Sequence, residues 1–157
     1  MNIRKAGIED TDLILKLRMD YLYYEDEKEI GSQEEQQDVK EKLKIYLQKR
    51  IPTGDFIAYV AEDNGNVLST AFLSIIERPP RTPFASNLTG TVYNVFTYPE
   101  FRRKGYATKV MSAILDEAKA LNLKSVDLLA TKDGIYLYET LGFGTINYAY
   151  MVKKFVY

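Results

Sequence analysis

Three successive cations, Arg102, Arg103 and Lys104, stand directly before Gly105. From Gly105 onwards, apolar residues recur at the spacing of a helix. The N-terminus of a helix carries unpaired N–H groups and a partial positive charge, so it binds anions. Gly105 would let the backbone approach a phosphate closely, and Thr108 would add a hydroxyl group. The pattern R-x-x-G-x-A therefore indicates a phosphate cradle. A solvated basic turn before a core helix is the alternative, and the pattern alone leaves both open.

The amino-acid inventory limits the chemistry that such a site can perform. The 157 residues include no cysteine and no histidine, which excludes thiolate nucleophiles, Ser-His-Asp triads and zinc sites built on these residues. Proton transfer must use Asp, Glu, Tyr, Lys or water, and the 13 tyrosines become candidates. The phosphate motifs G-x-x-x-x-G-K-[ST] and G-x-G-x-x-G are both missing from the sequence. We expect no metal ion.

Length and charge narrow the class of protein. The chain has the size of one domain, and we expect a single domain over residues 1–157. Lys and Arg number 21 against 22 Asp and Glu, so no overall charge favours binding to nucleic acid. No apolar run reaches about 18 residues, and MNIRKAGIED lacks the apolar region of a secretory signal. We therefore expect no membrane partner and a cytoplasmic location.

Hydrophobic periodicity predicts the elements of the first half of the chain. A strand over residues 2–6 precedes a helix over about 10–24, where Leu13, Leu17 and Tyr21 recur at helical spacing. A capping box over 32–35 begins a second helix, which Pro52-Thr-Gly54 ends. The runs FIAYVAE and VLSTAFLSII flank Asn64-Gly65, a pair typical of a tight hairpin turn.

In the second half, strands are predicted over 91–97 and 125–130, and helices from about Gly105 to Leu121 and from Gly134 to Leu141. The tail from Phe143 to Tyr157 is strand-like. The order of elements is therefore β-α-α-β-β-β-α-β-α-β. Such an order favours an α/β fold, with a mixed sheet and helices on both of its faces.

Two runs carry a resemblance to a known family. NVFTYPEFRRKGYATKVM resembles motif A of the GNAT (Gcn5-related) N-acetyltransferases, [QR]-x-x-G-x-[GA], and LYETLGF (137–143) resembles their motif B. The early run IRKAGIEDTDLILKLR is similar to the family's first strand and helix. The resemblance implies a central mixed, mostly antiparallel sheet in which the fourth strand splays from the fifth. It also implies acetyl-CoA as cosubstrate, bound in the cleft that this splay opens.

The family's site residues transfer to this sequence position by position. Free backbone groups of the splayed fourth strand, at Val95, Phe96 and Thr97, would hold the pantetheine arm. Arg102 fills the [QR] position, and Thr131 stands where an asparagine often contacts the cofactor. The pyrophosphate would lie on the backbone amides of Arg103, Lys104, Gly105, Tyr106, Ala107 and Thr108.

Tyr138 matches the tyrosine that commonly protonates the departing thiolate in this family. A role as a core residue of a short helix is the alternative reading. Without cysteine, an acetyl-cysteine intermediate is impossible, so the amine would attack the thioester directly in a ternary complex. A backbone N–H near Val95 would stabilise the oxyanion. Glu77 is a candidate general base, or only a solvated strand end, and Asn94 could position substrate or water.

The acceptor is left open by the sequence. In the family, the acidic and aromatic segment Tyr21–Glu41, which includes Tyr24, forms one wall of the acceptor site, although a solvated helix face fits its composition too. A polyamine, an amino acid, an aminoglycoside or a protein N-terminus would all qualify. The tyrosine-rich run INYAYMVKKFVY (146–157) could pair with a second copy in a homodimer. An acyl-CoA-binding sensor without turnover and a nucleic-acid module are the rival classes.

Overall fold

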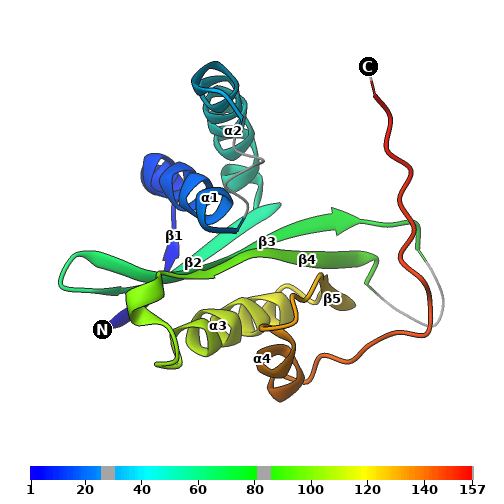
Figure 1. The fold of residues 1–157 in the computed structure, drawn as a ribbon. Coiled ribbons are helices and arrows are strands. Elements are labelled where there is room, and N and C mark those ends of the chain that lie inside the picture. The colour runs from blue at the N-terminus through cyan, green and yellow to red at the C-terminus, as the bar shows by residue number, and fades with distance from the viewer. Residues whose placement is uncertain (26–30, 81–85, 157) are drawn as a thin grey trace.

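The computed structural model describes residues 1–25, 31–80 and 86–156. Figure 1 shows a twisted sheet with helices on both of its faces. The elements are β1 (Asn2–Ala6), the 3-10 turn η1 (Ile8–Asp10), α1 (Thr11–Glu25), α2 (Gln33–Thr53), β2 (Phe56–Asp63), β3 (Asn66–Glu77), β4 (Leu88–Thr97), the 3-10 turn η2 (Pro99–Phe101), α3 (Tyr106–Ala120), β5 (Ser125–Leu128) and α4 (Ile135–Thr140).

Local signals in the sequence account for the ends of several elements. The Ser32 hydroxyl accepts a hydrogen bond from the Glu35 amide at 3.2 Å, and the Glu35 carboxylate accepts one from the Ser32 amide at 2.7 Å, which begins α2. Gly54 ends this helix in the left-handed conformation, with φ at 77°. Asn64 and Gly65 both have positive φ and connect β2 to β3, as the hairpin prediction requires.

The five strands lie in the order β1-β2-β3-β4-β5. The pairs from β1 to β4 are antiparallel, and β4 pairs with β5 in parallel. α1 and α2 cover one face of the sheet, and α3 and α4 lie on the other (Figure 1). The predicted mixed, mostly antiparallel sheet with helices on both faces is confirmed.

β4 contains a bulge in its middle. Tyr93 pairs with Phe72 and Phe96 pairs with Thr70, so two residues of β4, Asn94 and Val95, oppose the single residue Ala71 of β3. Asn94 adopts a left-handed conformation with φ at 55°. The bulge places Val95 against the core beneath α3, while Phe96 packs against rings of α1.

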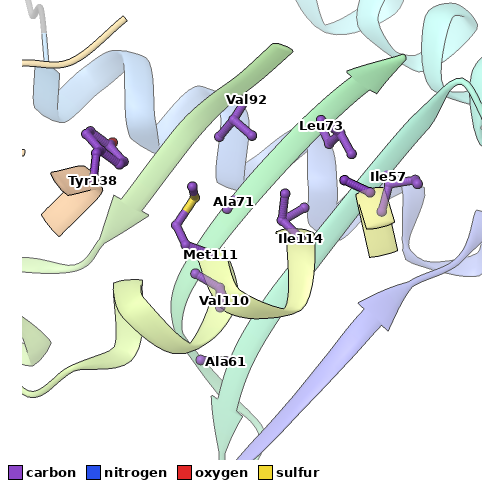
Figure 2. Packing of buried hydrophobic residues seen from close by; sticks show 10 residues of the cluster. Ile57, Ala61, Ala71, Leu73, Val92, Val110, Met111, Ile114 and Tyr138 are labelled. Atoms are coloured by element: carbon purple, nitrogen blue, oxygen red, sulfur yellow. The ribbon is translucent and has the colours of Figure 1, made fainter. Parts of the chain in front are cut away.

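Two hydrophobic clusters bury the faces of the sheet. The cluster under α1 and α2 centres on Ile14, Leu17, Leu47 and Phe72. The cluster under α3 includes Ile57, Leu73, Val92, Val110, Met111, Ile114 and Tyr138. Figure 2 shows this second cluster, with Tyr138 at its margin beside β4.

The prediction of a strand in the C-terminal tail is wrong for residues 143–156, which contain no helix or strand. A strand requires a partner for its backbone groups. β5 is the last strand of the described sheet, and the tail, which follows α4, pairs with no strand there (Figure 1). Its apolar side chains are therefore exposed, including Ile146 at 77%, Tyr148 at 84% and Met151 at 87%.

Within residues 1–25, 31–80 and 86–156, no helix has both the length and the apolar character needed to span a membrane. No group of three or more acidic side chains is arranged there to hold a metal ion, and the sequence offers no His or Cys ligand.

Candidate active site

The central feature of the site is an opening between β4 and β5. The parallel pairing covers only Thr89 to Val92 of β4, opposite Ser125 to Leu128. Beyond Val92 the β5-facing edge of β4 has no strand partner in the described part of the chain, although β3 still pairs with the other edge. The Phe96 carbonyl accepts a hydrogen bond from Ser69 Oγ at 2.9 Å, and the Thr97 carbonyl accepts one from Arg102 Nε at 3.1 Å. The predicted contacts of Val95, Phe96 and Thr97 with a cofactor stay predictions. The predicted splay of the fourth and fifth strands is confirmed.

The predicted cradle lies at the N-terminus of α3. Gly105 caps this helix in the left-handed conformation, with φ at 78° and no side-chain hydrogen bond to the first turn. The first hydrogen bond onto the cap is donated by the Lys109 amide to the Gly105 carbonyl at 3.2 Å. The amides before Lys109 thus have no carbonyl partner within the helix. A Cβ atom built on Gly105 meets no atom within 4 Å, so the surroundings of this cap residue are open.

The three cations before Gly105 are all exposed. Arg102 Nε donates to the carbonyl oxygen of Thr97 at 3.1 Å, which ties the turn to the end of β4. Lys104 Nζ donates to the Glu100 carbonyl at 3.2 Å and lies 5.6 Å from the centre of the Phe101 ring. No described carboxylate forms an ion pair with any of the three, so their charge is available to an anion at the helix terminus.

Tyr138 stands on α4 with 9% of its surface exposed, and its ring meets that of Phe143 edge-on at 6.0 Å. Its hydroxyl has no hydrogen-bond partner among the described residues. No buried polar side-chain atom there lacks a partner, so this hydroxyl must reach the surface. Burial, followed by the nearby charges of Tyr21 and Glu25, raises the pKa of Tyr138 above its ordinary value. The hydroxyl therefore keeps its proton at neutral pH and can serve as a donor.

Gly134 is a site residue that the sequence identified only as the start of a helix. A Cβ atom on Gly134 would lie 2.9 Å from Cε2 of Tyr138 and 3.2 Å from the hydroxyl oxygen of Thr131. The glycine allows the Tyr138 ring to lie directly on the backbone one turn earlier. The available signal was its position four residues before Tyr138, since residues i and i+4 meet on one face of a helix.

Thr131 is engaged in local structure. Its hydroxyl oxygen accepts a hydrogen bond from the Gly134 amide at 3.2 Å, and its carbonyl accepts from the Gly134 and Ile135 amides. These bonds hold the turn that begins α4. Thr131 thus positions the helix that carries Tyr138, and its predicted contact with a cofactor stays a prediction.

Aromatic side chains of α1 line the other side of β4. Tyr24, 47% exposed, stacks on Phe96 with ring centroids 5.4 Å apart, and Tyr21 meets Phe96 edge-on at 6.4 Å. Tyr98 completes the group at 4.9 Å from Phe96. The predicted aromatic wall is therefore next to the opening. Residues 26–30, which supply much of the predicted acidic segment, lie outside the described residues.

Asn94 is placed differently from the prediction of a substrate contact. Only 2% of it is exposed, because its side chain turns towards α1. Its Oδ1 accepts a hydrogen bond from Arg18 Nη1 at 3.2 Å, and its Nδ2 donates to the carbonyl of Leu17. Asn94 thus anchors α1 to the bulge, and any effect on a substrate would be exerted through Arg18.

The position of Glu77 contradicts its predicted role as the general base. Glu77 pairs with Leu88, and Leu88 to Val95 is seven residues, or about 23 Å along a strand. Its carboxylate instead accepts from Asn87 Nδ2 at 2.9 Å and lines a separate cavity of about 470 Å³ with Tyr46 and Arg50. Glu77 lies at the end of β3 remote from the opening, so it cannot take a proton there.

Residues 16–143 match the sequence model of the acetyltransferase (GNAT) family. This match covers most of the chain, including the opening, the cradle and Tyr138. The chain belongs to the GNAT acetyltransferase family. The comparison with curated proteins gives no significant match to this chain.

Solved structures agree with the assignment to the GNAT fold. A predicted acetyltransferase from Clostridium acetobutylicum, crystallised with acetyl-CoA, is 26% identical with a TM-score of 0.82, over 97% of this chain and 95% of that chain. A GCN5-related N-acetyltransferase from Ralstonia eutropha is 21% identical with a TM-score of 0.80, over 98% and 97% of the two chains. Glucosamine-6-phosphate N-acetyltransferase from Arabidopsis thaliana is 22% identical with a TM-score of 0.71, over 98% and 97%.

Proposed function

We propose that this GNAT protein is an acetyl-CoA-dependent N-acetyltransferase that passes the acetyl group directly to an amine. The observation that carries this proposal is the course of β4. Its unpaired edge runs from the region of Tyr138 to the turn that leads into the open cradle at Gly105. An acyl-CoA is a thioester joined by an extended amide arm to a pyrophosphate, so its three parts correspond to the donor hydroxyl, the strand edge and the cradle.

The chemical step follows from this arrangement. The neutral amine attacks the thioester carbonyl carbon, and the C–N bond forms while the carbonyl electrons move to oxygen. A backbone N–H of the bulged strand near Val95 stabilises this oxyanion. When the intermediate collapses, the C–S bond breaks and the Tyr138 hydroxyl protonates the leaving sulfur. The nitrogen then releases its extra proton, and the Tyr138 phenolate takes one up from solvent, which gives an N-acetyl amide, free coenzyme A and the starting form of Tyr138.

The amine must lose a proton before or during its attack. Glu77 is too distant, and the sequence contains no histidine. Glu25 is the last residue of α1 and directly follows Tyr24, whose ring stacks on Phe96 of β4, and the charge of Glu25 contributes to the raised pKa of Tyr138. We assign Glu25 to attract the ammonium form of the acceptor and to receive its proton, in place of Glu77.

The cradle is tested by placing a negative charge where the pyrophosphate would bind. Gly105→Glu should abolish acetyl-CoA binding in calorimetry, because both the side chain and its charge oppose the ligand. Gly65→Glu is the matched control, since Gly65 has a similar φ of 79° and equally open surroundings but lies in the β2–β3 turn. Equal acetyl-CoA affinity of the two variants would contradict the cradle.

A non-catalytic acyl-CoA sensor with the same fold would pass that binding test. An assay of thiol release from acetyl-CoA over a panel of amines distinguishes the enzyme from the sensor, because only the enzyme turns over. Tyr138→Phe keeps the ring and its packing on Phe143, so its turnover should fall roughly 10²-fold at unchanged acetyl-CoA affinity. Binding of acetyl-CoA with no thiol release for any amine would favour the sensor, and wild-type turnover of the Phe variant would make water the proton donor.

We further propose that two copies pair through their C-terminal tails. A groove of about 380 Å³ lies between α3, β5 and the end of α4, lined in part by Leu115, Leu123, Val126 and Phe143. A tail from a second copy could pair with the free edge of β5 and cover this groove with alternate apolar side chains. Light scattering at micromolar concentration should give a dimer mass, and Tyr148→Lys with Val152→Lys should shift it to monomer. A monomeric wild type would refute the pairing.

A further inference from the structure

Arg18 is a half-buried cation without a carboxylate partner in the described residues. Its Nη1 donates to the Asn94 side chain, and its guanidinium carbon lies 5.4 Å from the Tyr21 ring and 5.8 Å from the Tyr93 ring. The arginines elsewhere on this face of the fold are compensated. Arg4 pairs with Asp10 and Glu62, and Arg50 pairs with Asp55.

The contacts of Arg18 hold its side chain in place but leave most of its hydrogen-bonding capacity unused. A guanidinium carries five N–H donors in a fixed fork, and Asn94 takes up one of them. The two rings stabilise the charge through their faces and accept none of the remaining protons in the plane of the fork. Arg18 keeps part of its surface in water, and its unused donors can bind an anion that arrives from solution.

The position of Arg18 indicates that this anion is a group of the acceptor substrate. Asn94, which holds Arg18, belongs to the bulge whose other residue, Val95, provides the proposed oxyanion donor. Tyr21 touches Phe96 of the same strand on one side of Arg18, and Tyr21 lies near enough to Tyr138 for its ionised form to raise the pKa of Tyr138. Arg18 therefore belongs to the α1 wall of the reaction centre.

We propose that the acceptor of this enzyme is an amine that also carries an anionic group, a carboxylate or a phosphate, and that Arg18 binds this group. The inference rests on the acetyltransferase function proposed above and narrows its substrate class. Arg18, Tyr21 and Glu25 share one face of α1, with about 10 Å of helix axis between the two charged residues. The anion lies towards Arg18, and the amine lies towards Glu25 and the thioester. Uniformly cationic acceptors, such as polyamines, are disfavoured.

The test uses matched pairs of amines that differ only in the anion. One pair is an amino acid and its carboxamide, and another is an amino sugar and its phosphate ester. For the wild type, kcat/KM for thiol release should be at least 10-fold higher for the anionic member of one pair, and that pair identifies carboxylate or phosphate. Arg18→Gln, which can still hydrogen-bond to Asn94, should bring this ratio towards one, a loss of roughly 10- to 100-fold carried mainly by KM.

Two further variants control the interpretation. Arg18→Lys keeps the charge but not the fork, so the ratio should recover in part. Arg50→Gln removes an arginine that also lies over a tyrosine ring on α2 but faces the cavity at Glu77, and it should leave the ratio unchanged. If Arg18→Gln keeps the wild-type ratio, or if Arg50→Gln lowers the ratio as much as Arg18→Gln does, the assignment is overturned.

Failure of the proposed function is recognised separately. Calorimetry with acetyl-CoA alone tests the cofactor site, and a protein that does not bind it fails as an acetyltransferase. Calorimetry with each amine of the two pairs, with and without bound coenzyme A, tests the anion site without turnover. Equal affinity of the wild type for the anionic and neutral members of both pairs overturns the inference whatever the result with acetyl-CoA.

Discussion

Replacing Gly134 with alanine adds one methyl group beside Tyr138 and removes no functional group. Gly134 has φ at −87° and ψ at −20°, which alanine adopts without strain. The added Cβ would lie 2.9 Å from Cε2 of Tyr138, whereas carbon atoms prefer separations of about 3.5–4.0 Å. The Tyr138 ring must therefore move by roughly 0.6–1 Å, because the obstacle to the methyl group is a ring edge.

We expect this displacement to reduce catalysis far more than stability. Alanine lowers the entropy of the unfolded chain, worth about 0.4–1 kcal/mol, and the crowding offsets this by about 1–3 kcal/mol. The variant should thus be less stable than the wild type by about 1–2 kcal/mol in the free energy of unfolding. A shift of about 1 Å in a catalytic group can lower a rate roughly 10²-fold. The transfer rate should accordingly fall by roughly 10- to 100-fold.

The assay is single-turnover release of coenzyme A, followed with a thiol reagent and an accepted amine. Acetyl-CoA affinity should stay at the wild-type value because the cradle is untouched. Gly144→Ala is the matched control, since a Cβ there meets no atom within 4 Å. A Gly134→Ala protein that transfers acetyl at the wild-type rate would show that the placement of Tyr138 does not matter. An equal fall in the Gly144 variant would point to a general effect of the α4 region.

Three other outcomes are expected. Glu25→Gln should lower the transfer rate roughly 10²-fold at neutral pH and less at pH 10, where the amine is already neutral; a pH-independent loss would contradict its role as base. Ser32→Ala should lower the melting temperature by about 3 °C through loss of the α2 cap, and an unchanged value would show that the cap is redundant. Burial raises the pKa of Tyr93, and burial with Glu117 raises that of Tyr59 to about 12. The folded state therefore keeps protons that the unfolded chain loses above about pH 10. The urea midpoint should therefore fall between about pH 10 and about pH 12, with a smaller fall in Tyr59→Phe.

The parts of the fold that depend on local chemistry were predictable from the sequence. Ser32, Gly54 and Asn64-Gly65 determine the local conformation of their own turns, so the ends of α2 and the hairpin follow from nearby residues. The opening between β4 and β5 was predicted only through the family resemblance, because nothing in the residues themselves marks where strands diverge.

The incorrect or missing predictions share one physical origin. The sequence of one segment does not show which other strand or helix that segment will contact. Glu77 looked available because it ends a strand, but the register of β3 on β4 decides how far it lies from Val95. Arg18 was passed over because the side of α1 that meets β4 is set by packing. The tail after Phe143 alternates like a strand, yet alternation alone supplies no neighbour for its backbone.

The bulge in β4 divides the strand into two stretches of opposite parity. Before it, the even-numbered Val92 faces α3; after it, the odd-numbered Val95 does, and Phe96 faces α1. If the bulge closed with no residue removed, simple alternation would turn Phe96 towards α3 and Tyr138, and Val95 towards the tyrosines of α1. Deletion of Asn94 would instead leave Val95 and Phe96 on their present sides and remove the side-chain contacts with Leu17 and Arg18. The composition of the two walls therefore depends on the number of residues in the bulge as well as on their identity.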